Sequence, residues 1–376
     1  KNTVYSDQLP RGPETVNDQD DEAYVSDDFF AGGQPGGKRT PYSFAQGRYG
    51  KLQADPMLRV GWDYRGAIFL PGGGYGGQAL VFPMQADLHA AFQPYEHFTL
   101  LANVGARGRS EGVEAVFDDP KTPYLREAFL MVHELPYLAY LKAGRFTPTF
   151  GHRLDDHTSF IRRGLGLDAS LPETRVTGFE LGVNPNYPYL NIAGFWGSSP
   201  DRAPSAFDIF DTDPGFGTTM NVGYRHMGWS LGLSGMKRNR AVEFGGDRAA
   251  WGLNGAFNPW YYKRGLPFTY LFEIDRGEQE RFSGSIQQSL IFFQELSWLV
   301  TNGVNVLVGH NYEDPDRDVA YDEAHRGHVG LQITPVSGFT IDTRFRALFP
   351  RRDERFVFEA PSPDAADLFI QFHLWN

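Results

Sequence analysis

The sequence predicts an all-β protein: a transmembrane up-and-down antiparallel β-barrel of about 16 strands, preceded by an extended acidic N-terminal arm. Three observations support this fold class. Segments in which apolar and polar residues alternate recur along most of the chain, and period-2 alternation gives a strand one apolar and one polar face. The connections between these segments alternate between short turns and long polar loops. The final segment, residues 368–376, is itself an aromatic-rich strand.

Residues 1–46 form a separate region ahead of the barrel, which we assign to residues 47–376. The region holds four prolines, two Gly-Gly pairs and seven acidic residues between Glu14 and Asp28. Few apolar side chains and many like charges predict an extended or disordered periplasmic arm. A docking arm for a basic partner and a cation-binding segment are the alternatives, although the spacing does not match an EF-hand loop.

Alternating residues define the individual strands. The first strand covers about residues 57–70, where Trp62 and Tyr64 face one way and Asp63 faces the other. Alternation of this kind identifies a strand with one apolar and one polar face. The same pattern places the other strands near 78–93, 98–110, 123–135, 138–149, 174–184, 190–198, 216–227, 229–239, 248–258, 267–275, 284–301, 304–313, 324–334, 339–349 and 365–375.

Two places in this pattern predict a local irregularity. Alternation is poor around Phe292 and Phe293, so we expect a bulge there. The Asn302-Gly303 pair predicts a type I′ hairpin, in which both residues need positive φ. Aromatic residues near strand ends predict an interfacial girdle. They are Tyr95, Tyr137, Tyr187, Tyr189, Trp229, Trp260, Tyr261 and Tyr262.

The lengths of the connections sort by parity. Connections after even-numbered strands are mostly short, whereas those after odd-numbered strands are mostly long and polar. The long ones include 111–122, 151–173, 199–215, 314–323 and 350–364. In a bacterial barrel the short turns face the periplasm and the long loops face outside. An even number of strands then leaves both the N- and C-termini periplasmic, and we expect an export signal to have been removed ahead of Lys1.

The last strand closes the barrel in this interpretation. A sheet in lipid cannot keep an open edge, because every backbone N–H and C=O group needs a partner there. The last strand must therefore pair with the first. Its alternation directs Phe372 and Leu374 toward lipid. Gln371 and His373 should face the lumen, close to Asp63.

The inward face is polar, so we predict a water-filled lumen bordered by charges of both signs. A ladder of one sign would select ions by charge, whereas a mixed set favours cross-strand pairs. The candidate cations are Arg59, Arg65, Arg107, Arg109, Arg225, Arg344 and Arg346, and the candidate anions are Asp63, Asp87, Glu127, Glu180, Glu273 and Asp342.

Residues 144–151, Gly-Arg-Phe-Thr-Pro-Thr-Phe-Gly, resemble a segment of the phosphate-selective porins O and P and of related outer-membrane channels. Residues 125–129 also resemble a strand of that group. The resemblance implies a sixteen-stranded barrel through which small anions diffuse.

The longest connection after an odd-numbered strand is the third, residues 151–173. The third external loop of sixteen-stranded porins commonly folds into the lumen and narrows it. Acidic and basic side chains that face each other across such a constriction would create a transverse field. The charged candidates are His152, Arg153, Asp155, Asp156, His157, Arg162 and Arg163. An ordinary solvated surface loop and a metal site at the two histidines are the alternatives.

A second resemblance is to the barrels of porin–cytochrome conduits, which are also cysteine-free and carry an acidic arm. There the barrel insulates a multihaem c-type cytochrome for extracellular electron transfer. Glycines on the inward face would widen the bore and permit close approach of another backbone. These are Gly61, Gly105, Gly144, Gly182, Gly223, Gly232, Gly252 and Gly330. With no Cys in the chain, haem would belong to a separate cytochrome.

The sequence therefore predicts a channel, or porin, across the bacterial outer membrane, with the cytochrome sheath as the alternative. Expected partners are outer-membrane lipid, small solutes or ions, the possible cytochrome, and further copies of this chain. The two serine clusters that could supply a nucleophile, residues 157–159 and 198–199, have no nucleophile-elbow motif, and the chain has no Walker A or zinc motif. We expect neither catalysis nor a cofactor or metal bound by the chain itself. The sequence pI of about 5.4 argues against nucleic-acid binding.

Overall fold

The structure is a computed structural model of the chain. It describes residues 57–71, 79–95, 97–107, 109–111, 114–116, 124–152, 159–163, 175–185, 187–197, 215–239, 246–263, 265–281, 283–320, 322–350 and 366–375. The proposed arm, residues 1–46, lies outside these ranges, so its boundary with the barrel stays a prediction.

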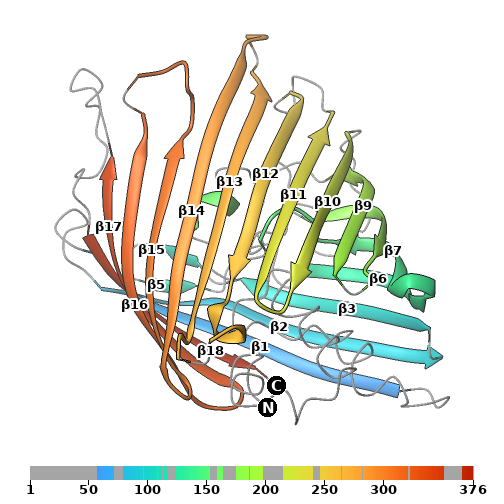
Figure 1. The fold of residues 1–376 in the computed structure, drawn as a ribbon, viewed down its shortest axis with the longest axis horizontal. Coiled ribbons are helices and arrows are strands. Elements are labelled where there is room, and N and C mark those ends of the chain that lie inside the picture. Colours follow the sequence, from blue (N-terminus) through green and yellow to red (C-terminus); the bar gives the residue numbers. More distant parts are fainter. Residues whose placement is uncertain are drawn as a thin grey trace.

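Sixteen antiparallel strands close into one barrel, as the sequence predicts. Figure 1 shows the strands tilted and lying side by side in a single curved wall. In sequence order they are β1 (Met57–Pro71), β2 (Leu80–Tyr95), β3 (Phe98–Arg107), β6 (Tyr124–Leu135), β7 (Ala139–Phe146), β8 (Val176–Val183), β9 (Pro188–Gly197), β10 (Phe216–His226), β11 (Trp229–Arg238), β12 (Arg248–Phe257), β13 (Phe268–Glu280), β14 (Ile286–Thr301), β15 (Val304–Asp314), β16 (Ala324–Val336), β17 (Phe339–Pro350) and β18 (Ala366–Trp375).

Each strand pairs with its neighbours in sequence, and β18 pairs with β1. The predicted closure by the last strand is thus confirmed, with Arg65 opposite His373 and Ile68 opposite Ile370. Closure leaves the sheet without a free edge. Strand pairing of this kind satisfies the backbone hydrogen-bonding groups from end to end of the wall.

The two faces of the wall differ in chemistry. Large apolar side chains point outward and are exposed, for example Val60, Leu88 and Trp251. Polar and charged side chains on the alternate positions point inward and are buried, for example Asp63 and Asp87. The alternation seen in the sequence therefore corresponds to an apolar outer surface and a polar interior. No helix in the described part of the chain has the length and apolar character needed to cross a membrane.

Four short elements complete the described fold. They are a separate hairpin of β4 (Arg109–Glu111) and β5 (Glu114–Val116), the 3₁₀ turns η3 (Pro136–Leu138) and η6 (Pro259–Tyr261), and the helix α4 (Phe160–Arg163). The β4–β5 hairpin contacts β2 but is not part of the barrel sheet. The predicted strand 98–110 was therefore too long, since β3 ends at Arg107.

The strand with poor alternation, β14, does hold a register shift, but not at Phe292 and Phe293. Pairing of β13 with β14 is regular there, and the register shift falls between Leu299 and Thr301 instead. Alternation looked poor because Phe293 is buried inside the barrel while Phe292 points outward. An apolar residue on the inner face broke the pattern without breaking the strand.

The predicted type I′ turn at Asn302-Gly303 is also wrong. Gly303 has a φ of 77°, but Asn302 is not among the described non-glycine residues with positive φ. The register shift between Leu299 and Thr301 lies directly before this turn, in which only the glycine is left-handed. The same shift lengthens β14 by an unpaired residue.

Candidate functional site: an inward segment and the lumen wall

The third long connection begins inside the barrel. β7 ends at Phe146, earlier than the predicted strand end at 149, and the chain then turns inward. The N–H of Gly151 donates to Ser234 Oγ of β11 at 2.9 Å. The N–H of His152 donates to Glu273 Oε2 of β13 at 2.6 Å. Because β11 and β13 lie four and six strands away from β7, residues 147–152 cut across the interior.

The backbone at Gly151 explains why the segment can dock there. Gly151 has a φ of 50°, and a Cβ at this position would collide with the carboxylate of Glu273. Glycine alone adopts this conformation without strain while letting a carboxylate approach so closely. His152 completes the contact, since its Nε2 lies 3.1 Å from Gly255 O and 3.2 Å from Phe272 O. Both acceptors are carbonyls, so this nitrogen carries the proton.

A second contact lies farther along the same connection, at residues 159–163. Asn311 Oδ1 of β15 accepts from Ser159 Oγ at 3.1 Å and from the Phe160 N–H at 3.3 Å. The guanidinium of Arg326 lies 4.6 Å from the centre of the Phe160 ring. In the strand order β15 is eight steps from β7, on the opposite side of a sixteen-stranded wall. We call residues 147–152 and 159–163 together the inward segment.

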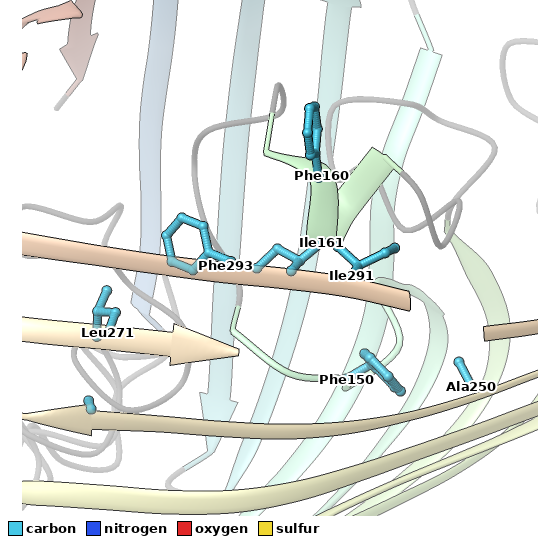
Figure 2. Close-up of a cluster of buried hydrophobic side chains, with 8 residues drawn as sticks. Phe150, Phe160, Ile161, Ala250, Leu271, Ile291 and Phe293 are labelled. Atoms are coloured by element: carbon cyan, nitrogen blue, oxygen red, sulfur yellow. The ribbon is translucent and has the colours of Figure 1, made fainter. Parts of the chain in front are cut away.

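Apolar packing holds the inward segment against the wall. Ile161 is 1% exposed and packs in one cluster with Ile291 and Phe293, which point inward from β14. Phe150 joins the same cluster beside Ala250 of β12. Figure 2 shows these side chains gathered between α4 and the strands. Burying one such side chain contributes about 1.5–3 kcal/mol. This apolar cluster therefore stabilises the docked position of the inward segment on the inner wall.

The start of the inward segment is held by two acidic side chains that the sequence marked as lumen anions. Glu180 accepts from Thr149 Oγ1 at 2.7 Å and forms an ion pair with Lys142 at 2.7 Å. Glu127 accepts from Thr147 Oγ1 at 2.9 Å. These carboxylates therefore fix where the chain leaves β7, in addition to lining the interior.

Many described lumen charges are paired with an opposite charge, either on the same strand or on another strand of the wall. At the closing seam, His373 Nε2 lies 2.7 Å from Asp63 Oδ2, and Arg65 Nε lies 3.4 Å from Asp63 Oδ1. Asp87 Oδ2 lies 3.1 Å from Arg126 Nη1 on β6. Of these three pairs, only that of His373 with Asp63 joins adjacent strands, as cross-strand pairing predicts, since β3 lies between β2 and β6.

A further network spans β14, β16 and β17. Glu295 Oε2 lies 3.1 Å from Arg344 Nη1 and 3.0 Å from His328 Nε2. Arg344 also forms an ion pair with Asp342 at 2.9 Å. One buried carboxylate thus links two basic side chains from neighbouring strands.

Replacing Glu295 with Gln is expected to lower the free energy of unfolding by about 3 kcal/mol, the low end for breaking a buried ion pair, because Arg344 keeps Asp342. Urea titration of the folded barrel in lipid measures the change. The exposed pair Arg276–Glu278 supplies the control, since Glu278→Gln should cost no more than about 0.5 kcal/mol. Equal losses in the two variants would show that the network does not stabilise the wall.

The remaining predicted lumen arginines differ in their surroundings. Arg225 lies 5.4 Å from the centre of the Tyr189 ring, and Arg346 pairs with Asp367 at 2.6 Å. Arg59 and Arg107 belong to β1 and β3. Arg109 does not belong to a barrel strand, contrary to the prediction, because it lies in the separate β4–β5 hairpin. That its side chain faces the lumen stays a prediction.

The charged residues of the third connection are described only in part. His152, Arg162 and Arg163 lie in described ranges, the two arginines in α4. Arg153, Asp155, Asp156 and His157 lie outside the described residues. Within the described residues, no group of three or more His, Cys, Asp or Glu side chains is arranged to hold a metal ion.

Neighbouring rings fill the space above several inward glycines. A Cβ at Gly182 would meet the ring of Tyr140, and one at Gly223 or Gly232 would meet the ring of Tyr189. Phe150 of the inward segment lies over Gly252. At these glycines the absence of a side chain does not widen the bore, because aromatic rings of the same chain occupy the space that a side chain would fill. Tyr189 is buried there, so its predicted place in the outer girdle is wrong.

Comparisons with known proteins identify solved structures that share this fold. No family model and no curated protein matches the chain. Among solved structures, an anion-selective porin from Comamonas acidovorans has a TM-score of 0.59 at 10% identity, covering 86% of this chain and 100% of its own. OprB of Pseudomonas putida has a TM-score of 0.63 at 9% identity, covering 88% and 98%. The trimer form of OmpT of Vibrio cholerae has a TM-score of 0.59 at 10% identity, covering 86% and 100%. Similarity at this identity shows a shared fold.

Proposed function

We propose that the chain is an outer-membrane channel, a porin, through which small solutes diffuse past the inward segment. The observation that carries the proposal is the segment itself, which hydrogen-bonds to Ser234, Glu273 and Asn311 across the interior. An apolar outer face suits lipid and a polar inner face suits water. A chain crossing a water-filled lumen narrows the passage without closing the wall.

The charges around the passage suggest how the channel acts on charged solutes. Cations on the described wall include Arg65, Arg126 and Arg344, and each is paired with a carboxylate. Asp155 and Asp156 follow His152 in the sequence. Both lie outside the described residues. We propose that charges of both signs along the passage, rather than a one-sign ladder, act on solutes.

Two further points belong to the same proposal. The chain resides in the bacterial outer membrane with its short turns toward the periplasm, as parity of the connections suggests. It assembles with further copies of itself, which is supported by the trimer form of a similar barrel. The sheath for a multihaem cytochrome has less support, because a segment of this chain occupies the interior and rings fill the inner glycine gaps.

A liposome-swelling assay tests the proposal. Liposomes that contain the folded protein should swell in small sugars and amino acids, and swelling should stop above a size limit set by the inward segment. A parallel stain for covalent haem should find no protein copurifying with the native barrel. A folded barrel that admits no solute, or one that always carries a haem protein, would overturn the channel proposal.

A further inference from the structure

Two histidines stand on the outer face of the barrel, on strands that also expose large apolar side chains there. His310 of β15 shares its face with Val308, which is 47% exposed, and His325 of β16 shares its face with Val329, which is 56% exposed. Ionisable side chains are rare on a wall that faces lipid, and where they occur they mark sites with a function. We therefore expect this histidine pair to bind a ligand or a partner group.

The two imidazoles face each other through one nitrogen each. His310 Nε2 lies 3.1 Å from His325 Nδ1, and the ring centres are 5.3 Å apart with planes inclined by 29°. Imidazole nitrogens bind Zn²⁺ at about 2.0–2.1 Å. Two of them on one cation are then roughly 2.8–3.4 Å apart, for angles between square-planar and tetrahedral. The observed separation lies within that interval.

We propose that His310 and His325 form a cross-strand site for a divalent transition-metal cation, Cu²⁺ or Zn²⁺. In the metal-free pair one ring donates a proton to the other, as neutral imidazoles can. The cation takes the place of this shared proton, and the donating ring moves its proton to its other nitrogen. Both rings stay neutral, no proton leaves the protein, and water fills the remaining coordination positions.

The surroundings leave room for those waters. Gly327 is the cross-strand partner of His310, and no atom lies within 4 Å of where its Cβ would stand. The ring of Tyr312 lies 4.9 Å from that of His325 and its hydroxyl is 3.5 Å from Asp314 Oδ2. A tyrosine beside a carboxylate marks the polar edge of the apolar band. The cation would therefore sit at that edge, where water reaches it.

Imidazole donors select the metal class. Neutral imidazole suits Cu²⁺ and Zn²⁺, whereas Mg²⁺ and Ca²⁺ prefer carboxylate and carbonyl oxygens. Two protein ligands agree with the absence of a three-donor group among the described residues. Because the histidines come from adjacent strands, the bound cation would also fasten β15 to β16 near the long-connection end.

Cu²⁺ binding to the full-length folded protein in detergent tests the site. Electron paramagnetic resonance of the wild type should show one copper per chain with splitting from two nitrogens. His310→Gln and His325→Gln should each lose this signal and weaken copper binding by about tenfold or more, since even second-shell changes cost 10–100-fold. His226, near the short-turn end beside Tyr262, provides the matched control.

The outcomes separate the site from background. His226→Gln should keep the two-nitrogen signal, and all variants should migrate as folded barrels on unheated gels. The eight other histidines and the acidic residues give a background that is the same in every variant except His226→Gln, which lacks one of those histidines. Two results would contradict the metal site. The wild type could show no two-nitrogen signal at micromolar copper, or the signal could survive in the His310→Gln/His325→Gln double variant. Either result would mean that the two histidines form only a hydrogen-bonded pair.

Discussion

Replacing Ile161 with Asp is expected to release α4 from the barrel wall and to raise the single-channel conductance. Ile161 is 1% exposed and lies against Ile291 and Phe293. Losing this burial costs about 2–5 kcal/mol. An unpaired carboxylate is also unfavourable in this apolar cluster. About 3 kcal/mol shifts the ratio of docked to undocked segment by roughly a hundredfold. The conductance of single channels in planar bilayers, compared with the wild type, measures the release.

Ile161→Leu is the control for this substitution, because it keeps an apolar side chain of the same volume. Its conductance should equal that of the wild type. Both variants should show unchanged heat-modifiable migration, since the wall does not depend on α4 for its strand pairing. Folded Ile161→Asp channels with wild-type conductance would mean that the inward segment does not narrow the passage.

Replacing Gly144 with Ala is expected to cost about 3 kcal/mol or more of folding free energy. Gly144 has a φ of 136° in β7, where L-residues are strained, and an added Cβ would collide with the backbone of Ala128 and Phe129 on β6. Neither backbone can move without breaking the β6–β7 pairing. Refolding yield into lipid and the urea midpoint should both fall.

Gly235→Ala is the matched control, since no atom lies within 4 Å of where its Cβ would stand. That variant should fold like the wild type, or slightly better, because alanine lowers the entropy of the unfolded chain. A Gly144→Ala variant that is as stable as Gly235→Ala would show that the wall yields at β6–β7. The close approach at Gly144 would then not be required for the fold.

The strands could be predicted from the sequence because each has one apolar and one polar face, as around Trp62 and Asp63. The errors occurred where the inner face is not polar. Phe293 and Tyr189 are buried inside, one beneath α4 and one over glycines. The sequence does not show what packs on these two rings. Arg109 was assigned to a barrel strand because it continues the polar positions of that strand two residues beyond Arg107, where β3 ends.

The candidate site was predictable only in part. Alternation marks Glu180 and Glu273 as inward, yet it cannot show that their acceptors hold residues 149–152. Ser234 and Asn311 look like any other inward polar residue, because their role depends on a segment from the far wall. A usable signal was present in Ile291 and Phe293, which place two apolar residues on an otherwise polar face.

The most direct test of the central claim is the single-channel conductance of the wild-type protein in a planar bilayer. A barrel with a water-filled lumen and an inward segment should insert in discrete steps of uniform size, with current proportional to voltage and rising with salt concentration. A preparation that migrates as a folded barrel, yet gives no conductance steps, would contradict the account.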